Sequence, residues 1–238
     1  NITMQTVLDQ SLNTGTVEVA KRLGGGSITR HARDTMYHYF HDKLGLGEQT
    51  GIELAGEARG IVVPPTEVQG NAVRYANMTF GQGLDVTPLQ VATAFSTIVN
   101  GGIRIKPTVI AGSIDDDGTY HESTAQTGAR VLKESTSASM RQMIYHARST
   151  WVNVGDRAGY QIGGKTGTAQ TIENGKYVFS QTEGTYLGMG GEKGELPRYV
   201  ILATFAGPNR AFTGEHAIGA FTEMSNWMLS YLKLEPKG

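Results

Sequence analysis

A lysine, two threonines and a glycine follow one another in the segment Lys165-Thr166-Gly167-Thr168. The lysine supplies a fixed positive charge, and the threonine hydroxyls can donate hydrogen bonds to a carboxylate. Gly167 has no side chain, so a ligand can approach the backbone closely there. The segment therefore predicts a site for an anionic group. Taken alone, however, such a run of small and polar residues recurs on strands by chance, and a lysine at the end of a strand beside a tight glycine contact is the simpler interpretation.

A second polar group, Ser11-Leu12-Asn13, lies between two predicted helices near the start of the chain. A hydroxyl beside a lysine can pass a proton to a leaving amine, and an asparagine amide can hold a substrate carbonyl.

The elements that must position these residues are helical in the first part of the chain and extended later. Thr87, Pro88 and Gln90 form a strong helix start, with a capping threonine, a proline at the first helical position and a capping-box glutamine. Hydrophobic periodicity and turn residues predict the remaining elements. The predicted helices cover residues 2–8, 16–23, 35–45, 88–98, 137–148 and 220–234, and the predicted strands cover 102–114, 160–171, 184–191 and 198–208.

This order predicts an α+β fold in which helices cover a late antiparallel sheet of three strands. No domain boundary is apparent in the 238 residues. The formal net charge of −1 does not suggest a nucleic-acid partner. The absence of cysteine excludes disulfides, thiol catalysis and cysteine metal sites. No apolar run reaches the roughly 18 residues typical of a membrane span.

The ordered pair Ser-x-Asn and Lys-Thr-Gly resembles two of the three signature motifs of the penicillin-binding proteins and related β-lactamases. Two further stretches, "LGLGEQTGIELAGE" and "FGQGLDVTPLQVATAFSTIVNGG", resemble the region between those motifs in class B penicillin-binding proteins. The resemblance covers nearly the whole chain. Residues 1–238 are thus identified as the C-terminal portion of a class B transpeptidase domain.

The resemblance implies a role for each motif residue. Ser11 and Asn13 would line one wall of a groove and face Lys165 and Thr168 on the opposite wall. Ser11 would relay a proton and Asn13 would bind the donor peptide. Lys165, Thr166 and Thr168 would hold the terminal carboxylate of a D-Ala-D-Ala stem peptide or of a β-lactam, with Gly167 between them. The backbone N–H of Thr168 would be an oxyanion-hole donor, a role worth about 2.7–4 kcal/mol of transition-state stabilisation. No metal or organic cofactor is implied.

The family's serine nucleophile belongs to a Ser-x-x-Lys motif upstream of Ser-x-Asn, and none precedes Ser11 here. The match Ser230–Lys233 follows Lys-Thr-Gly near the end of the last predicted helix, where a nucleophile is not expected. We expect this chain to lack the nucleophile helix and two N-terminal strands, which leaves the strand "RYVILATF" without a partner at one edge. The chain alone is therefore predicted to be inactive, and the missing N-terminal part of the domain is an expected partner.

Two rival interpretations remain open. Tyr75-Ala76-Asn77 is a second candidate for the middle motif, and it would favour a β-lactamase or a D,D-carboxypeptidase of the same superfamily. The second alternative is a protein that binds without catalysis, either a β-lactam sensor or a scaffold. The resemblance further implies a location on the extracytoplasmic face of the bacterial membrane and a glycan polymerase as partner.

Other polar clusters are interpreted as non-functional. Five potential metal ligands fall within or just before the predicted helix 35–45, but no convergent ligand from another segment is evident. They are His31, Asp34, His38, His41 and Asp42. The acidic run Asp115–Gly118 lacks the spacing of a calcium loop, and Gly24–Gly26 lacks the strand and Lys-Ser/Thr of a phosphate loop.

Overall fold

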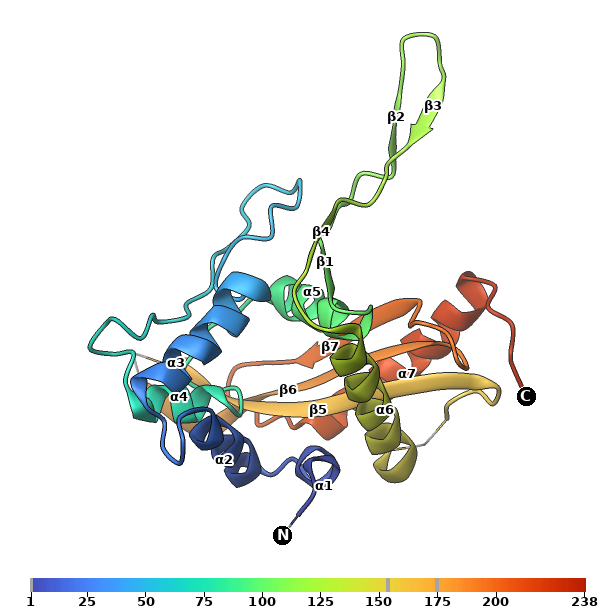
Figure 1. Cartoon of the computed structure of the whole chain (residues 1–238). Coiled ribbons are helices and arrows are strands. Elements are labelled where there is room, and N and C mark those ends of the chain that lie inside the picture. The colour runs from blue at the N-terminus through green and yellow to red at the C-terminus, as the bar shows by residue number, and fades with distance from the viewer. Residues whose placement is uncertain (1, 153–154, 174–175) are drawn as a thin grey trace.

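The computed structural model describes residues 2–152, 155–173 and 176–238. A helical region comes first, followed by two small two-stranded sheets and a three-stranded antiparallel sheet (Figure 1). The predicted α+β class is confirmed. The helices are α1 (Met4–Asp9), α2 (Asn13–Leu23), α3 (Arg30–Tyr37), the π-helix η1 (His38–Lys43), α4 (Ala72–Met78), α5 (Pro88–Val99), α6 (Glu134–Trp151) and α7 (Gly214–Tyr231).

The main sheet has the strand order β5-β6-β7, with β5 (Tyr160–Glu173), β6 (Lys176–Glu192) and β7 (Tyr199–Phe205). Within the described ranges, β5 and β7 each have β6 as their one strand neighbour. The pairing is antiparallel, and Lys165 lies opposite Leu187 in β6. The segment that contains Lys165 therefore lies on an edge strand.

Helices cover both faces of this sheet (Figure 1). On one face, Phe221 and Leu229 of α7 pack with Tyr186 of β6 in a buried cluster. On the other face, Tyr145 of α6 packs with Met189 of β6 and with residues of α5. Successive strand residues alternate between these faces. Lys165 thus belongs to the face of α6, and Thr166 and Thr168 belong to the face of α7.

The α2–α4 region has its own core, formed by Ala20, Met36, Val62, Tyr75 and Met78. Sequence reasoning missed α4, although Asn71 caps it by accepting from the backbone N–H groups of Val73 and Arg74. The predicted helix 35–45 is divided between α3 and the π-helix η1. α7 begins at Gly214, six residues before its predicted start at residue 220, and this earlier start brings it into contact with β5.

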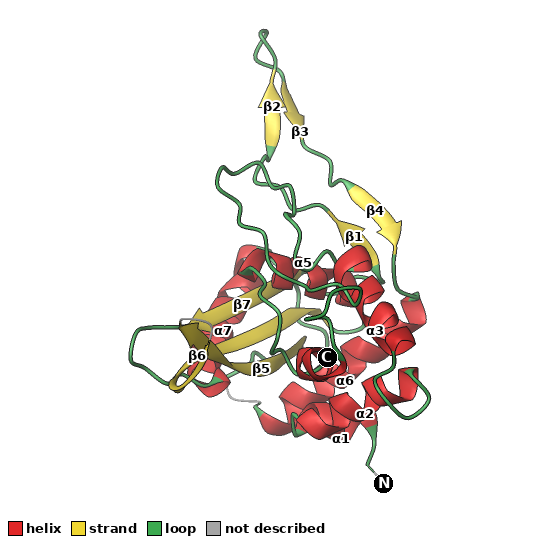
Figure 2. Ribbon diagram, turned by 90° about the vertical axis from the view of Figure 1, so that its left-hand side faces the viewer, coloured by secondary structure: helices red, strands yellow, loops and turns green. Residues whose placement is uncertain are grey.

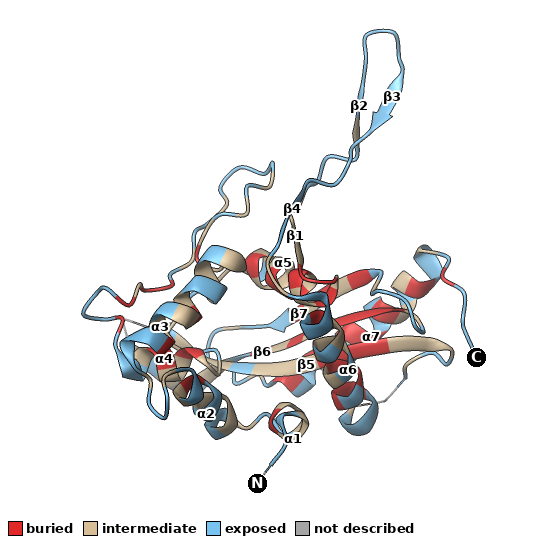
Figure 3. Ribbon diagram, in the orientation of Figure 1, coloured by how far each residue is buried: buried red, intermediate tan, exposed pale blue. Residues whose placement is uncertain are grey.

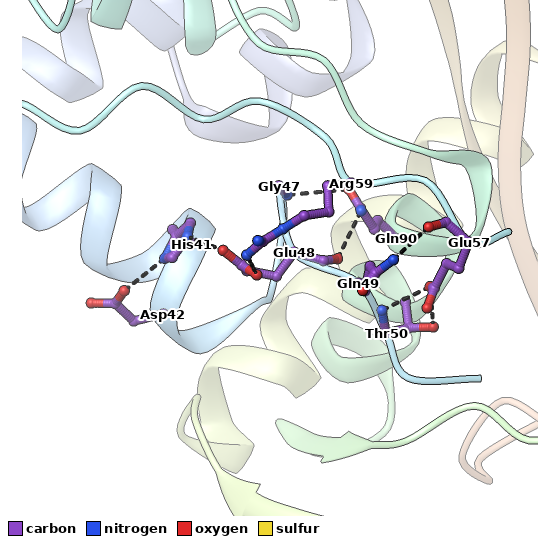
Figure 4. A network of polar contacts seen from close by, with 9 residues as sticks. All are labelled: His41, Asp42, Gly47, Glu48, Gln49, Thr50, Glu57, Arg59 and Gln90. Atoms are coloured by element: carbon purple, nitrogen blue, oxygen red, sulfur yellow. Dashed lines mark hydrogen bonds and ion pairs between the residues drawn. The ribbon is translucent and has the colours of Figure 1, made fainter. Parts of the chain in front are cut away.

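The predicted start of α5 is confirmed in detail, because Thr87 and Gln90 form a complete capping box behind Pro88. The buried Gln90 side chain also accepts from the Gly47 backbone N–H at 3.1 Å and donates to the Glu48 carbonyl at 2.7 Å. Figure 4 shows how this amide joins a polar network along the loop that follows η1. In that network Glu48 pairs with His41 and Arg59, and Glu57 accepts from Thr50.

The predicted strand 102–114 is broken into β1 (Ile103–Ile105) and β2 (Gly112–Ile114). β1 pairs with β4 (Thr127–Arg130), and β2 pairs with β3 (Tyr120–Glu122) to form a hairpin that projects away from the body (Figure 2). Almost every residue of this hairpin is exposed (Figure 3). We call residues 107–126 the arm. None of the described helices is long and apolar enough to cross a membrane.

Candidate functional site

Ser11 occupies an unusual backbone conformation at the end of α1. Its φ is +52°, in the left-handed region that glycine normally occupies. The Ser11 N–H donates to the Leu8 carbonyl at 3.2 Å, and the Leu12 N–H donates to the Val7 carbonyl at 2.9 Å. These two bonds form a Schellman motif, in which glycine is the usual residue at the position of Ser11. A serine there indicates that the hydroxyl serves a purpose other than ending the helix.

The end of α1 is tied to α6. Gln5 Nε2 donates to Asp9 Oδ1 at 2.6 Å and to the Met143 carbonyl at 3.0 Å. His146 Nδ1 of α6 lies 3.3 Å from an Asp9 carboxylate oxygen. Since α6 packs on β5, these contacts hold the Ser11 turn in a fixed relation to the sheet.

Lys165 contacts Ser11 directly, although the two residues are 154 positions apart in the chain. Lys165 Nζ donates to Ser11 Oγ at 2.9 Å and to Thr166 Oγ1 at 3.2 Å. No carboxylate of the described chain lies within 4.0 Å of this ammonium group as an ion-pair partner. Burial lowers the pKa of Lys165. A half-buried cation paired only with neutral oxygens is a favourable place for an anion from outside.

Thr166 and Thr168 lie on the other face of β5, where α7 begins. The Gly214 N–H donates to Thr168 Oγ1 at 3.1 Å. Thr168 remains exposed, so its hydroxyl is accessible to a ligand. Gly167 lies between them, and a side chain at this position would meet Thr185 Oγ1 at 2.5 Å. The structure thus brings the hydroxyls of Ser11 and Thr166 together around the Lys165 ammonium group, and Thr168 follows two residues after Thr166 on the same face of β5.

Asn13 is exposed at the first position of α2, two residues after Ser11. Its backbone carbonyl accepts from Thr16 Oγ1 at 2.8 Å. Among the described residues its side chain has no hydrogen-bond partner, so the amide is available but is not in contact with Lys165 or Thr168.

The rival middle motif does not have the geometry of a reactive site. Tyr75 is 0% exposed in the core of the α2–α4 region, and its hydroxyl donates to the Val63 carbonyl at 2.8 Å. Burial raises the pKa of Tyr75. A tyrosine with this environment cannot reach a substrate without unfolding α4, so the structure argues against Tyr75-Ala76-Asn77 as the middle motif.

The remaining sequence candidates lie away from Lys165. Ser230 is at the C-terminal end of α7 and accepts from Arg157 at 2.5 Å. His38 and His41 each contact Asp42 at 2.9 Å on an exposed surface. A cavity of about 300 Å³ lies at the base of the arm, lined by residues that include Gly45, Gln90, Arg104 and Lys106, and is therefore also separate from the Ser11–Lys165 contact.

Sequence reasoning missed Gly214. A glycine at the start of a helix is unremarkable in the sequence, and Gly214 lies 46 positions after Thr168. The clue that was available is the pair Thr213 and His216, which form the capping box of α7 and so define where the helix begins.

Comparisons with known proteins agree on one family. Residues 1–224 match the family model for the penicillin binding protein transpeptidase domain. Penicillin-binding protein PbpB of Mycolicibacterium smegmatis is 33% identical over 236 residues, which are 94% of this chain and 34% of that protein. Stage V sporulation protein D of Bacillus subtilis is 36% identical over 176 residues, which are 72% of this chain and 25% of that protein.

Solved structures give the same result. The crystal structure of penicillin-binding protein 3 from Mycobacterium tuberculosis complexed with aztreonam superposes with a TM-score of 0.80 at 30% identity. The match covers 99% of this chain and 52% of that one. The chain spans about a third of the length of the two PbpB proteins among its relatives. With a matched family model over most of its length, the chain belongs to the penicillin-binding protein transpeptidase domain family.

Proposed function

We propose that the protein carrying this chain is a peptidoglycan D,D-transpeptidase and that residues 1–238 form the C-terminal portion of its transpeptidase domain. The site is formed by Ser11, Asn13, Lys165, Thr166, Gly167 and Thr168. The observation that carries this proposal is the 2.9 Å hydrogen bond from Lys165 Nζ to Ser11 Oγ, which joins the two sequence motifs.

The substrate class follows from the chemistry of the site. A D-Ala-D-Ala stem peptide ends in a carboxylate, and a penicillin carries one beside its reactive ring. The ammonium group of Lys165 and the hydroxyls of Thr166 and Thr168 supply a charge and two donors for that group. Asn13 supplies an amide for a peptide carbonyl. In the same proposal, the Thr168 N–H is a donor to the oxyanion that forms during acyl transfer.

Ser11 serves as a proton relay. Because its oxygen accepts from Lys165, its own proton can be given to the leaving amine when the peptide bond breaks, and Lys165 can then replace it. The lowered pKa of Lys165 favours this proton donation. The acyl group is then held as an ester on the nucleophilic serine. An amine of a second stem peptide attacks this ester, a new peptide bond replaces it, and the proton lost by the amine returns to the serine oxygen.

The serine that becomes acylated is supplied from outside residues 1–238. The one Ser-x-x-Lys match in the chain is Ser230–Lys233, and its position at the end of α7 does not suit a nucleophile. In the complete protein we infer an extracytoplasmic location, where peptidoglycan is assembled, and a glycan polymerase as a functional partner.

Labelling with a fluorescent penicillin tests the proposal. In the full-length protein, Lys165→Met should lower the acylation rate about 10²–10⁴-fold, the range expected for loss of a positioned acid–base group. Lys133→Met is the matched control, because Lys133 is exposed and its side chain has no hydrogen bond or ion pair among the described contacts. Wild-type labelling of Lys165→Met would refute the site.

The isolated chain tests the origin of the nucleophile. Residues 1–238, shown to be folded by circular dichroism, should not become covalently labelled. Attachment of penicillin to Ser230 or to any other residue of the chain would refute this part of the proposal.

A further inference from the structure

Gly214 is the first residue of α7, and its backbone N–H is directed at the proposed site. The first N–H groups of a helix have no acceptor within the helix. The Gly214 N–H donates instead to an acceptor outside the helix, Thr168 Oγ1, at 3.1 Å. Gly214 itself is buried, so this contact is made inside the protein, behind the exposed Thr168.

The contact determines what the Thr168 hydroxyl can do. A hydroxyl has one proton to donate and two lone pairs that accept. Because a lone pair of Thr168 is engaged by Gly214, the proton is left to donate to a ligand. The hydroxyl proton of Thr166 is likewise left to donate, since Thr166 Oγ1 accepts from Lys165 Nζ at 3.2 Å. Both hydroxyls of the segment therefore accept from a protein donor on one side and can donate on the other.

We propose that Gly214 is a positioning residue for carboxylate recognition, which it achieves by fixing the direction of the Thr168 hydroxyl proton. The inference rests on the proposed carboxylate site and extends it to a residue of α7. It assigns to the start of this helix a function that helix packing alone does not require.

The packing explains why the residue is glycine. A Cβ atom at position 214 would lie 2.6 Å from Thr166 Cβ and 2.9 Å from the Gly167 backbone N. A Cβ atom at Gly184, which pairs with Thr168 across the sheet, would collide with the Thr213 carbonyl. The start of α7 is thus in close contact with β5 and β6 at once.

Buried packing further along α7 holds the helix against the sheet, so α7 should not shift to make room for a methyl group at position 214. Ala217 and Phe221, one and two turns further along, are both 0% exposed, and the Phe221 ring packs against the Tyr186 ring with centroids 4.8 Å apart. We therefore expect a side chain at position 214 to displace Thr166–Thr168 on β5, which is an edge strand with less support.

The chain provides a matched control in the same helix. Gly219 also lies in α7, and a Cβ atom there would meet nothing within 4 Å. Both Gly214→Ala and Gly219→Ala add one methyl group to one helix, and at an open helix position alanine is the more stable residue. Only Gly214→Ala should disturb Thr168.

The experiment measures acylation of the full-length protein by a penicillin and by the methyl ester of the same penicillin. We expect Gly214→Ala to lower the second-order rate for the free acid about tenfold, which corresponds to about one lost hydrogen bond to a charged group. The rate for the ester should fall by a clearly smaller factor than the rate for the acid, because any displacement of the Thr168 N–H affects both substrates alike. Gly219→Ala should leave both rates near wild type. Equal losses for acid and ester would show that Gly214 acts only through packing and would overturn the inference, as would a wild-type rate for Gly214→Ala.

A second measurement does not depend on the folding of Gly214→Ala. In Thr168→Val the Gly214 N–H loses its acceptor, so its amide hydrogen should exchange faster with solvent than in the wild type, while Thr168→Ser should retain the protection. Unchanged exchange in Thr168→Val would overturn the inference. Failure of the proposed function itself looks different, because wild-type protein would then not be acylated, or Lys165→Met would be acylated normally.

Discussion

Replacing Ser11 with glycine and with alanine separates the two roles that its position allows. Ser11 ends α1 in a Schellman motif with φ +52°, and its hydroxyl accepts from Lys165. If Ser11 only ended the helix, glycine would be the better residue at this position. If its hydroxyl relays a proton, glycine and alanine should be equally harmful to activity.

The stability difference can be estimated from the backbone. Both variants lose the hydrogen bond to Lys165, so this loss cancels in the comparison. Alanine keeps the strain of the left-handed conformation, about 1–2 kcal/mol, whereas glycine does not. Glycine loses about 0.5–1 kcal/mol more in unfolded-state entropy. Ser11→Gly should therefore be more stable than Ser11→Ala by about 0.5–1 kcal/mol, or roughly 1–4 °C in Tm for a domain of this size.

The assay pairs thermal unfolding with penicillin acylation in the full-length protein. We expect Ser11→Gly to unfold at the higher temperature and both variants to lose about 10²–10⁴-fold in acylation rate. Wild-type acylation of Ser11→Gly would refute the proton relay. Equal Tm values for the two variants would refute the assignment of strain to Ser11.

Two further predictions concern charged groups. Because burial lowers the pKa of Lys165, the folded state binds fewer protons than the unfolded state between that lowered pKa and the ordinary value of 10.5, so the free energy of unfolding should rise with pH in this window. In Lys165→Met that rise should be smaller, as urea unfolding at neutral and alkaline pH can show; identical pH slopes would contradict the burial of the ammonium group. Arg148 is 0% exposed and donates to Asp156 at 2.7 and 2.6 Å, to Tyr186 Oη and to Thr222 Oγ1, so Arg148→Ala should lower the free energy of unfolding by about 3–5 kcal/mol. The exposed Arg157→Ala should lower it by less than about 1 kcal/mol, and a similar small effect for both would show that the buried network is not stabilising.

The parts of the fold that sequence reasoning predicted are those with strong local signals. The start of α5 was predicted because Thr87, Pro88 and Gln90 are adjacent and act locally. The three strands of the main sheet were predicted because their composition and glycine-rich ends are distinct. The predicted strand 102–114 was wrong as one element, because β1 and β2 pair with different partners and no local signal encodes that choice.

The site was predictable only in part, for a related reason. Ser11 and Lys165 could be matched through a family resemblance, since nothing local to either residue indicates a contact across 154 positions. The contact between Gly214 and Thr168 depends on how α7 approaches the sheet, which is decided by tertiary packing. The left-handed φ of Ser11 was likewise hidden, because a serine in the segment between two helices reads as an ordinary turn residue.

The arm has a practical consequence for work with this protein. β2 and β3 pair only with each other among the described strands, and the turn at Gly118 is far along an exposed hairpin from the sheet that carries Lys165 (Figure 1). A spectroscopic probe or an affinity tag inserted at that turn would disturb only hydrogen bonds within the tip of the hairpin, such as that from the Gly118 N–H to the Asp115 carbonyl. The hairpin thus provides an attachment point where the molecule can be observed or immobilised without touching the proposed penicillin site.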